Sequence, residues 1–324
     1  AYLEARKANA RGAEALARFK TLAAPDNTEG RAALAAEPES DDPVDTVGAV
    51  LLAQLRASEH RRMGDTAATI AWLETALAAT ETLGWHLQRL IILDQLGPAQ
   101  LRMRDSKAAR ATWDRYLAGA KSLGHRPMFA NGHFRLGWHH ITVMQWAKAR
   151  AAFRKSIEFG DLQTDPAGIS ACWINIGHAW RNEGRPQEAI APLRKGLEIA
   201  ERIGHARWRW NALDNLRGVY HQLGQHEKAL EIATTLLGEA ETRNDPLELA
   251  RNHASMAEAY FHLYRYADAL RHREAEHAQY VRAGLKKASN STLISVGSAL
   301  SALRRFDEAI RVFQQAIEAA REMG

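Results

Sequence analysis

The sequence predicts an all-α protein with the architecture of an α-solenoid, a right-handed superhelix of helix-turn-helix repeats. Three observations support this fold class. Three residue registers recur every forty residues without an insertion, apolar residues recur at three- and four-residue spacing, and no segment alternates as a strand does. A constant period of this length is typical of repeat proteins in which each unit buries its apolar face against the next.

Two of the registers hold small residues at every position except Arg217, and these let helices pack closely. The first lies within the first helix of each unit and usually follows an apolar residue. The second lies twelve residues further on, early in the second helix. Small side chains at these positions allow a neighbouring helix to approach. The first register comprises Ala57, Gly97, Gly137, Gly177, Arg217, Ala257 and Gly297, and the second comprises Thr69, Ala109, Ala149, Ala189, Ala229, Ala269 and Ala309.

The third register predicts the end of each second helix. Gly and Asn suit this place because the residue after a helix often adopts a left-handed conformation. Asp165-Pro166 and Asp245-Pro246 predict helix starts, with Asp as N-cap and Pro at the first helical position, and Glu248 completes a capping box. Residues 46–324 are therefore expected to form seven units of two antiparallel helices. The third register comprises Gly84, Gly124, Thr164, Gly204, Asn244, Gly284 and Gly324.

Both ends of the array are expected to differ from the middle. Residues 1–45 are predicted to form a degenerate N-terminal capping repeat, with a helix over about residues 2–23, followed by the acidic linker Glu37–Asp45. A seventh unit that ends bare would leave an apolar face uncovered. We therefore expect a continuation of the chain or a partner there. The first residue is not Met, which suggests a trimmed chain or a piece of something longer.

The composition is that of a folded chain without a membrane span. Hydrophobic residues make up 46% and charged residues 25% of the 324 residues, which argues against disorder. No run of about 18 apolar residues occurs, and charges stand where a signal peptide would need its apolar stretch. The single cysteine, Cys172, excludes an internal disulfide and fits a reducing cytoplasm.

The residues within a unit resemble those of a tetratricopeptide repeat. The clearest unit reads Trp173, Ile176, Gly177, Trp180, Ala189, Leu193 and Leu197. Two further units follow the same template at Leu213, Leu216, Tyr220 and Ala229 and at Leu293, Val296, Leu300, Ala309 and Phe313. The usual period is about 34 residues. The forty-residue version resembles the extended class, whose members include MalT-like sensor arrays, Rap-type peptide receptors, LGN/Pins adaptors and kinesin light chains. The Pro that usually closes the second helix is missing, and Glu201 or Glu241 stands there.

The resemblance implies a concave groove lined by the first helices. Asn175 and Asn215 resemble the ladder of asparagines with which adaptors of this class bind peptide backbones, since Asn both donates and accepts hydrogen bonds. Arginines in the groove suit carboxylates, and an exposed Trp offers an apolar platform. Each of these residues is also an ordinary choice for a solvated helix. The expected groove residues are Asn131, Arg135, Trp138, Asn175, His178, Arg181, Asn182, Asn215, His221, Arg251, Glu258 and His262.

No catalytic, cofactor or metal site is expected. The sequence holds no phosphate-binding glycine loop, dinucleotide fingerprint, His-Glu-x-x-His or paired-cysteine motif. Cys172 is expected to be a packed residue, and the histidines around His253, His262, His272 and His277 are expected to pack rather than to bind a metal. Pro98 in a predicted helix interior indicates a tolerated kink, with a bend that shapes the groove as the alternative.

These expectations combine into a non-catalytic scaffold that binds a protein or peptide in its groove. The closest related hypothesis is a sensor or regulatory segment of a larger bacterial signalling protein or transcription regulator, whose output domain is missing from this chain. The alternative is nucleic-acid binding by residues 46–164, which carry 16 Lys and Arg against 9 Asp and Glu. Helical repeats that read RNA need equivalent side chains in successive units, and the groove residues here vary.

Overall fold

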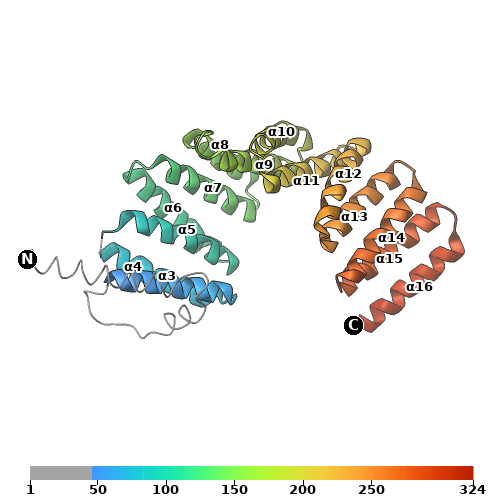
Figure 1. Cartoon of the computed structure of the whole chain (residues 1–324), viewed down its shortest axis with the longest axis horizontal. Helices are drawn as coiled ribbons and strands as arrows, with labels where there is room; N and C mark the ends of the chain where they lie inside the picture. Colours follow the sequence, from blue (N-terminus) through green and yellow to red (C-terminus); the bar gives the residue numbers. More distant parts are fainter. Residues whose placement is uncertain (1–45, 83, 324) are drawn as a thin grey trace, which may run out of the picture. The chain divides into compact units, whose positions relative to one another are not determined.

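The computed structural model describes residues 46–82 and 84–323, and every regular element in these residues is an α-helix (Figure 1). The predicted capping repeat and acidic linker in residues 1–45 lie outside the described residues. The chain divides into two compact units with the boundary between Asp161 and Leu162. The prediction of an all-α solenoid is confirmed, because consecutive helices form hairpins that pack against the next hairpin within each unit.

From here on, "unit" means one of these two compact units, and "repeat" means one forty-residue hairpin. The first unit contains three described hairpins and the second unit contains four. We call the odd-numbered helices first helices and the even-numbered ones second helices. The first unit comprises α3 (Thr46–Arg62), α4 (Thr66–Thr82), α5 (His86–Arg102), α6 (Ser106–Ser122), α7 (Arg126–Thr142) and α8 (Trp146–Phe159). The second comprises α9 (Pro166–Asn182), α10 (Pro186–Arg202), α11 (Ala206–Gln222), α12 (His226–Arg243), α13 (Pro246–His262), α14 (Tyr266–Arg282), α15 (Lys286–Ala302) and α16 (Phe306–Met323).

The period of the sequence recurs in the helix starts. The first helices of the second unit start at Pro166, Ala206, Pro246 and Lys286, steps of forty residues, and the first helices of the first unit keep the same spacing. Second helices start twenty residues after the first helices. Within residues 46–82 and 84–323, no helix combines the length and apolar character that crossing a bilayer requires.

Left-handed residues end both helices of a hairpin. The third register is confirmed at Gly84, Gly124, Gly204, Asn244 and Gly284, which all have positive φ. A second series, which the sequence analysis missed, ends the first helices and includes Arg104, Met144, Tyr264 and Arg304. The register is wrong at Thr164, because α8 ends early at Phe159 and Gly160 continues in an extended conformation. A β-branched residue is poorly suited to the left-handed region, so the chain ends this helix differently.

The predicted N-caps are confirmed, with one correction. Asp165 accepts a hydrogen bond from the backbone N–H of Gly168 at 2.8 Å, and Asp245 accepts from those of Leu247 and Glu248. The Glu248 carboxylate does not complete a capping box. It accepts instead from Arg243 in the preceding helix, with Nη2 to Oε2 at 2.6 Å. This ion pair connects the end of α12 to the start of α13.

Small residues of the first helices face large residues of the second helices. A Cβ added to Gly97 would lie 2.0 Å from the Trp113 ring, and one added to Gly177 would lie 2.4 Å from Cγ of Leu193. Trp113 and Leu193 are fully buried. The first register is therefore a close-approach position, as predicted. Helix α5 continues through Pro98 to Arg102.

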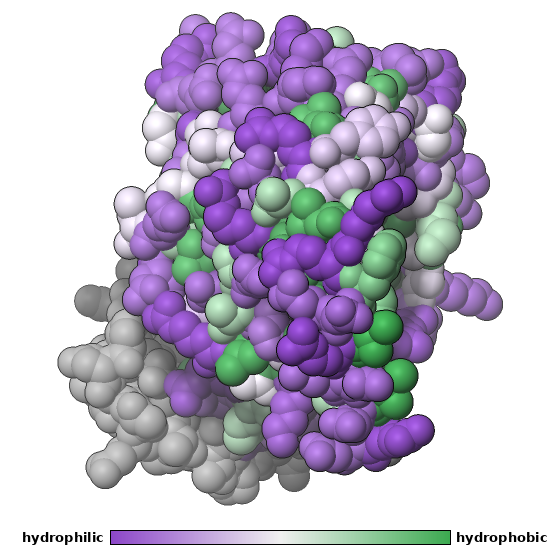
Figure 2. Space-filling model, turned by 90° about the vertical axis from the view of Figure 1, so that its right-hand side faces the viewer, coloured by the Kyte–Doolittle hydropathy of each residue, from purple (hydrophilic) through white to green (hydrophobic). Residues whose placement is uncertain are grey.

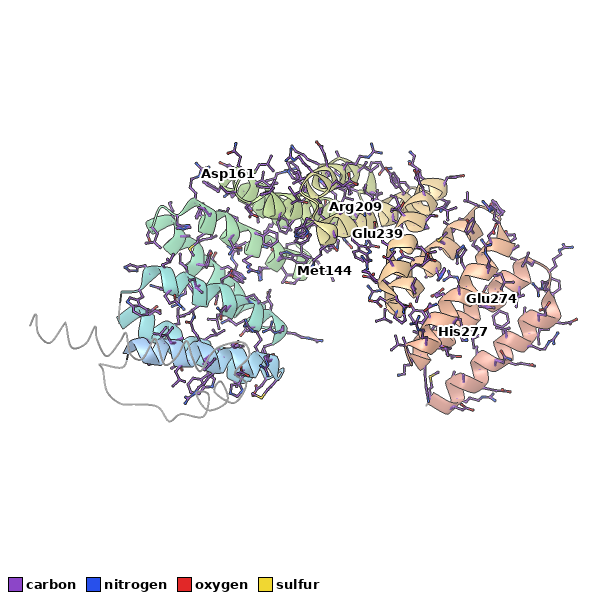
Figure 3. All side chains as sticks on the ribbon, viewed as in Figure 1. Met144, Asp161, Arg209, Glu239, Glu274 and His277 are labelled. Atoms are coloured by element: carbon purple, nitrogen blue, oxygen red, sulfur yellow. The ribbon has the colours of Figure 1, made fainter. Side chains whose placement is uncertain are left out.

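Ion pairs also connect second helices to first helices. Arg209 on α11 pairs with Glu239 on α12, next to it in Figure 3, and its Nε lies 3.6 Å from Oε1 of Glu201 on α10. The Cys172 side chain is buried, as expected.

The last helix exposes apolar side chains. On α16, Phe306 is 57% exposed, Ile310 is 54% exposed and Ile317 is 53% exposed. Figure 2 looks from the side on which α16 lies in Figure 1 and shows hydrophobic residues among a mostly hydrophilic surface. The seventh repeat, α15 and α16, therefore exposes the apolar face that the sequence predicts.

Candidate binding surfaces on the first helices

In the first unit, the predicted groove residues Asn131 and Arg135 share one acidic partner. Arg135 on α7 donates from Nε and Nη2 to the two carboxylate oxygens of Asp94 on α5, each at 2.8 Å. Asn131 donates to the same carboxylate at 2.9 Å and also to the Tyr116 hydroxyl at 3.2 Å. Burial raises the pKa of Tyr116, and the bond from Asn131 opposes this rise. Because Asp94 already occupies the fork of Arg135, this arginine is not free to bind a partner carboxylate.

Trp138 lies one helical turn after Arg135 and is 38% exposed. A large aromatic side chain with this exposure offers contact area to a partner at low entropic cost. Trp138 is thus the residue of this predicted set that remains available on the first unit.

In the second unit, Arg181 on α9 and Asn215 on α11 contact each other. Nη1 of Arg181 donates to Oδ1 of Asn215 at 3.3 Å. The guanidinium also lies against Gly218, where an added Cβ would come within 2.5 Å of Nη1. Burial lowers the pKa of Arg181, an effect that nearby Asp214 opposes and Arg217 reinforces. Arg217 in turn pairs with Asp214 on the same helix.

The next contact along the first helices joins His221 on α11 to Ser255 on α13, with Nε2 and Oγ 3.2 Å apart. His262 at the end of α13 stacks on His226 at the start of α12, with ring centroids 4.5 Å apart. Burial lowers the pKa of His221, while Glu258 opposes this shift. Burial, aided by Arg181, also lowers the pKa of His178. These two histidines are therefore neutral at pH 7.

The structure brings half of the predicted groove residues together on three consecutive first helices of one unit. We call this set the α9–α11–α13 surface. Its exposed members lie mainly on α13, since Glu258 and His262 are exposed while His178, Arg181, Asn215 and His221 are half-buried. The surface can accept and donate hydrogen bonds and carries both signs of charge. It is defined by His178, Arg181, Asn215, His221, Glu258 and His262.

The amides of the two predicted ladder asparagines, Asn175 and Asn215, donate to backbone carbonyls of their own helices. Asn175 is only 5% exposed, and its amide donates to the carbonyl of Ala171 in its own helix at 2.8 Å. Asn215 donates in the same way to the carbonyl of Asn211 at 2.8 Å. Burial thus removes Asn175 from the surface that a partner can reach. Asn182 is exposed at the end of α9 and donates to the His178 carbonyl, and Arg251 is exposed on α13.

Sequence reasoning missed the acidic partners of these arginines. Asp94 and Asp214 stand at the same place in their repeats, a place that Phe134, Ile174 and Ile294 fill in other repeats. A carboxylate at a register that is apolar in most other repeats is the signal that predicts a half-buried pairing, because an unpaired charge there would be costly.

The histidine clusters form pairs. Nδ1 of His253 and Nδ1 of His272 lie 3.0 Å apart, so one ring donates and the other accepts. His277 lies elsewhere, 3.0 Å from the Ser289 carbonyl. Over the described residues, no three His, Cys, Asp or Glu side chains gather as a metal-binding group.

The tetratricopeptide repeat profile matches residues 212–247 and 292–324. No curated protein matches the sequence. The chain is similar to a Signal Transduction ATPase with Numerous Domains protein with a tetratricopeptide repeat sensor from Pyrococcus horikoshii, at a TM-score of 0.71 and 13% identity over 85% of this chain and 43% of that chain. This chain therefore spans less than half the length of that protein.

Two further similar structures are Rap proteins. The apo form of RapI has a TM-score of 0.62 and 14% identity over 85% of this chain and 98% of that chain. A Rap protein complexed with competence and sporulation factor has a TM-score of 0.55 and 12% identity over 98% of both chains. At these identities the likeness shows the fold. The chain therefore carries tetratricopeptide-repeat sequence at residues 212–247 and 292–324 and, with its forty-residue hairpins, has the fold of these helical-repeat neighbours.

Proposed function

We propose that the protein is a non-catalytic scaffold that binds an extended peptide or a partner segment on its first helices. The observation that carries this proposal is the lateral contact between polar side chains of three consecutive first helices, Arg181 to Asn215 and His221 to Ser255. These contacts hold the half-buried residues in place. They leave Glu258 and His262 exposed, next to one another on the last turns of α13.

Such a surface suits a peptide because rigid helices hold its polar groups at fixed positions. A preorganised surface loses little conformational entropy when a partner binds. Its polar groups pair with backbone N–H and C=O groups, which an extended peptide presents in every residue. The neighbour that is complexed with competence and sporulation factor supports a bound partner on a protein of this fold.

Display of a random peptide library tests this proposal. The full chain is expected to enrich peptides that bind it with micromolar affinity, and Glu258→Ala with His262→Ala is expected to weaken them about tenfold or more. Glu198→Ala on α10 is the matched control, since it removes an exposed carboxylate from a second helix. Enriched peptides that bind the double variant and the control equally would overturn the assignment to this surface.

We further propose a sensor or regulatory role within a larger cytoplasmic signalling protein that carries an output domain outside this chain. The neighbour with a tetratricopeptide repeat sensor supports this proposal, because this chain covers only 43% of it. The single buried cysteine fits a reducing compartment. The reading frame that encodes the chain provides the test. A second folded domain in the same frame is expected, and a frame that encodes this chain alone would contradict the proposal.

No specific contact among the described residues favours the alternative, nucleic-acid binding by residues 46–164. Several arginines in this region pair with carboxylates, including Arg115 with Glu81 at 2.9 Å and Arg135 with Asp94 at 2.8 Å. Titration of DNA and RNA over a range of salt concentrations separates the two functions, since phosphate contacts give a steep salt dependence.

A further inference from the structure

Two second helices, α12 and α14, depart from the packing pattern of the other five. Opposite the small residue of the first helix, the second helices of five repeats place a large apolar side chain. In α14 the equivalent residue is Arg273, opposite Ala257 on α13. In α12 the pattern is reversed, with Ala233 opposite Arg217. The five apolar residues are Leu73, Trp113, Phe153, Leu193 and Phe313.

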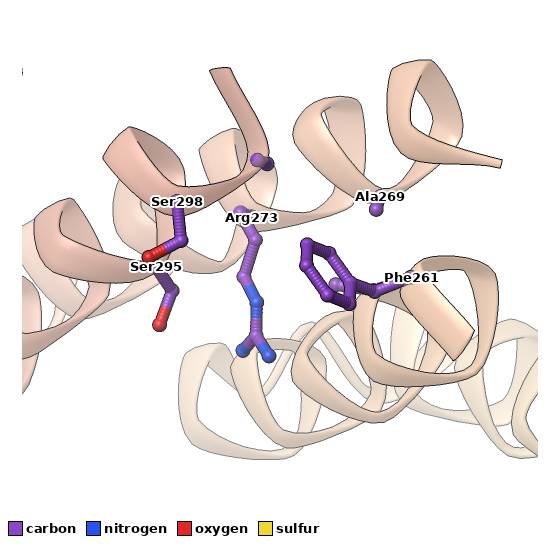
Figure 4. Close-up of a pocket in the computed structure, with 7 residues that line it drawn as sticks. Phe261, Ala269, Arg273, Ser295 and Ser298 are labelled. Atoms are coloured by element: carbon purple, nitrogen blue, oxygen red, sulfur yellow. The ribbon is translucent and has the colours of Figure 1, made fainter. Parts of the chain in front are cut away.

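A hollow of about 310 Å³ lies beside Arg273. In other repeats the side chain from the second helix touches the small residue directly, as the Phe313 ring does at Gly297. The lining of the hollow includes the small residues Ala257, Ala269 and Ala299, which are at most 1% exposed, and Phe261, which is 39% exposed (Figure 4). A guanidinium thus replaces the phenyl ring found at this position in α8 and α16, and the hollow lies beside it.

One N–H group of the Arg273 guanidinium has a partner in the protein, and the others have none that is described. Its Nη1 donates to Oε2 of Glu276 at 2.8 Å, and the Arg273 side chain is 22% exposed. Glu276 is buried and also lies 3.4 Å from the Thr292 hydroxyl. The guanidinium makes no other hydrogen bond within the described residues, so four of its five N–H groups remain for a ligand.

Two hydroxyls lie on the other side of the guanidinium. Figure 4 shows Arg273 between Phe261 and the two serines Ser295 and Ser298 of α15. Ser298 donates its own hydrogen to the Ile294 carbonyl at 2.9 Å. The hollow thus combines the exposed Phe261 ring with the polar groups of Arg273 and Ser295, and small-ligand sites usually combine apolar surface with a few polar groups in this way.

We propose that this hollow binds an apolar monocarboxylate of about the size of one aromatic ring, either a free acid or the C-terminal residue of a peptide. The ring packs against Phe261, the exposed apolar side chain of the lining. The carboxylate accepts charge-assisted hydrogen bonds from Arg273 and a bond from Ser295. The hollow adjoins the α9–α11–α13 surface, because Ala257 and Phe261 of α13 line it next to Glu258 and His262. None of its lining residues belongs to that set, so variants of Arg273 test this proposal and variants of Glu258 and His262 test the proposed function.

Titration of the full chain with 3-phenylpropionate and with its neutral amide tests the carboxylate. The acid is expected to bind in the millimolar range and at least about tenfold more tightly than the amide, because a hydrogen bond between charged groups contributes this much. Arg273→Leu is expected to weaken the acid at least about tenfold. Equal binding of acid and amide, or an unchanged affinity in Arg273→Leu, would overturn the proposal.

Arg271→Leu is the matched control, since this arginine lies on the same helix with 68% exposure and pairs with Asp268 at 3.3 Å. It is expected to leave binding unchanged, and a loss as large as that of Arg273→Leu would overturn the proposal. Arg273→Phe is expected to fill the hollow, to raise the melting temperature and to abolish binding. Bound acid in this variant would also contradict the site.

A peptide that ends in Phe, with a free or an amidated C-terminus, distinguishes the two sources. Binding of 3-phenylpropionate and of the free-acid peptide supports a site for apolar acids in general. Binding of the free-acid peptide alone assigns the site to a chain end, and binding of neither acid overturns the proposal.

Discussion

The guanidinium of Arg135 on α7 donates hydrogen bonds to both carboxylate oxygens of Asp94 on α5, and Asn131 donates to the same carboxylate. Two residues that the sequence suggests for partner binding thus connect neighbouring hairpins of the first unit. In the second unit, Arg181 and His221 make the corresponding kind of lateral contact. Polar contacts between first helices therefore stabilise the stack and also fix the geometry of its exposed polar groups.

Asp94→Ala is expected to lower the free energy of unfolding by about 1–3 kcal/mol, because it leaves Arg135 and Asn131 without their acceptor in a half-buried place. Urea denaturation followed by tryptophan fluorescence measures this loss. Asp114→Ala is the control, since this carboxylate pairs with Arg110 within one helix and is 52% exposed. It is expected to change stability by less than about 0.5 kcal/mol. Similar losses in both variants would show that the Asp94 contact has no special role.

Gly177→Ala is expected to destabilise the second unit by about 1–3 kcal/mol, because the added methyl would overlap Leu193 at 2.4 Å. Gly238→Ala in α12 is expected to act in the opposite direction. Nothing lies within 4 Å of its added Cβ, and Ala favours a helix over Gly by about 0.5–1 kcal/mol. Urea denaturation of both variants measures the two signs. A stable Gly177→Ala protein would contradict the close packing of the repeats.

Met144→Gly is expected to stabilise the first unit by about 0.5–1 kcal/mol. Met144 has φ 55°, where a side chain is strained, and is 73% exposed, so little packing is lost (Figure 3). Met63→Gly is the control, because Met63 is 68% exposed and lies outside the positive-φ set. It is expected to be neutral or destabilising. Thermal unfolding compares them, and a lower melting temperature for Met144→Gly would show that φ is not strained there.

The protein is expected to lose stability as the pH falls from 6.5 towards 4. Burial, together with His253 and Arg271 and against Asp268, lowers the pKa of His272 to about 4. The unfolded chain then binds a proton that the folded chain refuses, so acid favours unfolding. This one group contributes up to about 2 kcal/mol between pH 7 and pH 5.

Urea denaturation at several pH values checks this slope. In His272→Gln, the free energy of unfolding of the second unit is expected to depend less on pH, because glutamine does not titrate. His133 and His140, whose pKa values burial also lowers to about 4, keep their contribution in the first unit. An unchanged slope in His272→Gln would show that other groups cause the acid sensitivity.

The repeat period, the hairpin architecture and the close-approach glycines could be predicted because they depend on residues at constant spacing. Gly97, Gly137 and Gly177 each contact the large residue sixteen positions later, a relation that a period makes visible. The early end of α8 could not be predicted in the same way. It depends on the loop after Phe159, where the register holds Thr164 rather than Gly.

The candidate site could be predicted only as a set of positions. Helical geometry indicates which residues of a first helix leave the core, and His262 and Glu258 do so. It does not indicate what a polar side chain finds across the gap to the next helix. The Asn175 amide donates to a backbone carbonyl of its own helix, and Arg135 donates to the carboxylate of Asp94. Such pairings depend on side chains from different repeats, about 34 to 41 residues apart, whose identities follow no period.

Site-specific photo-cross-linking tests the proposed binding surface most directly. A benzoylphenylalanine placed at His262 is expected to cross-link a peptide selected by display, and one placed at Glu198 on α10 is expected not to do so. Mass spectrometry of the digested product identifies the linked position. Cross-links from residue 262 that an excess of unlabelled peptide suppresses would support the account, whereas equal yields from both positions, or a yield only from residue 198, would contradict it.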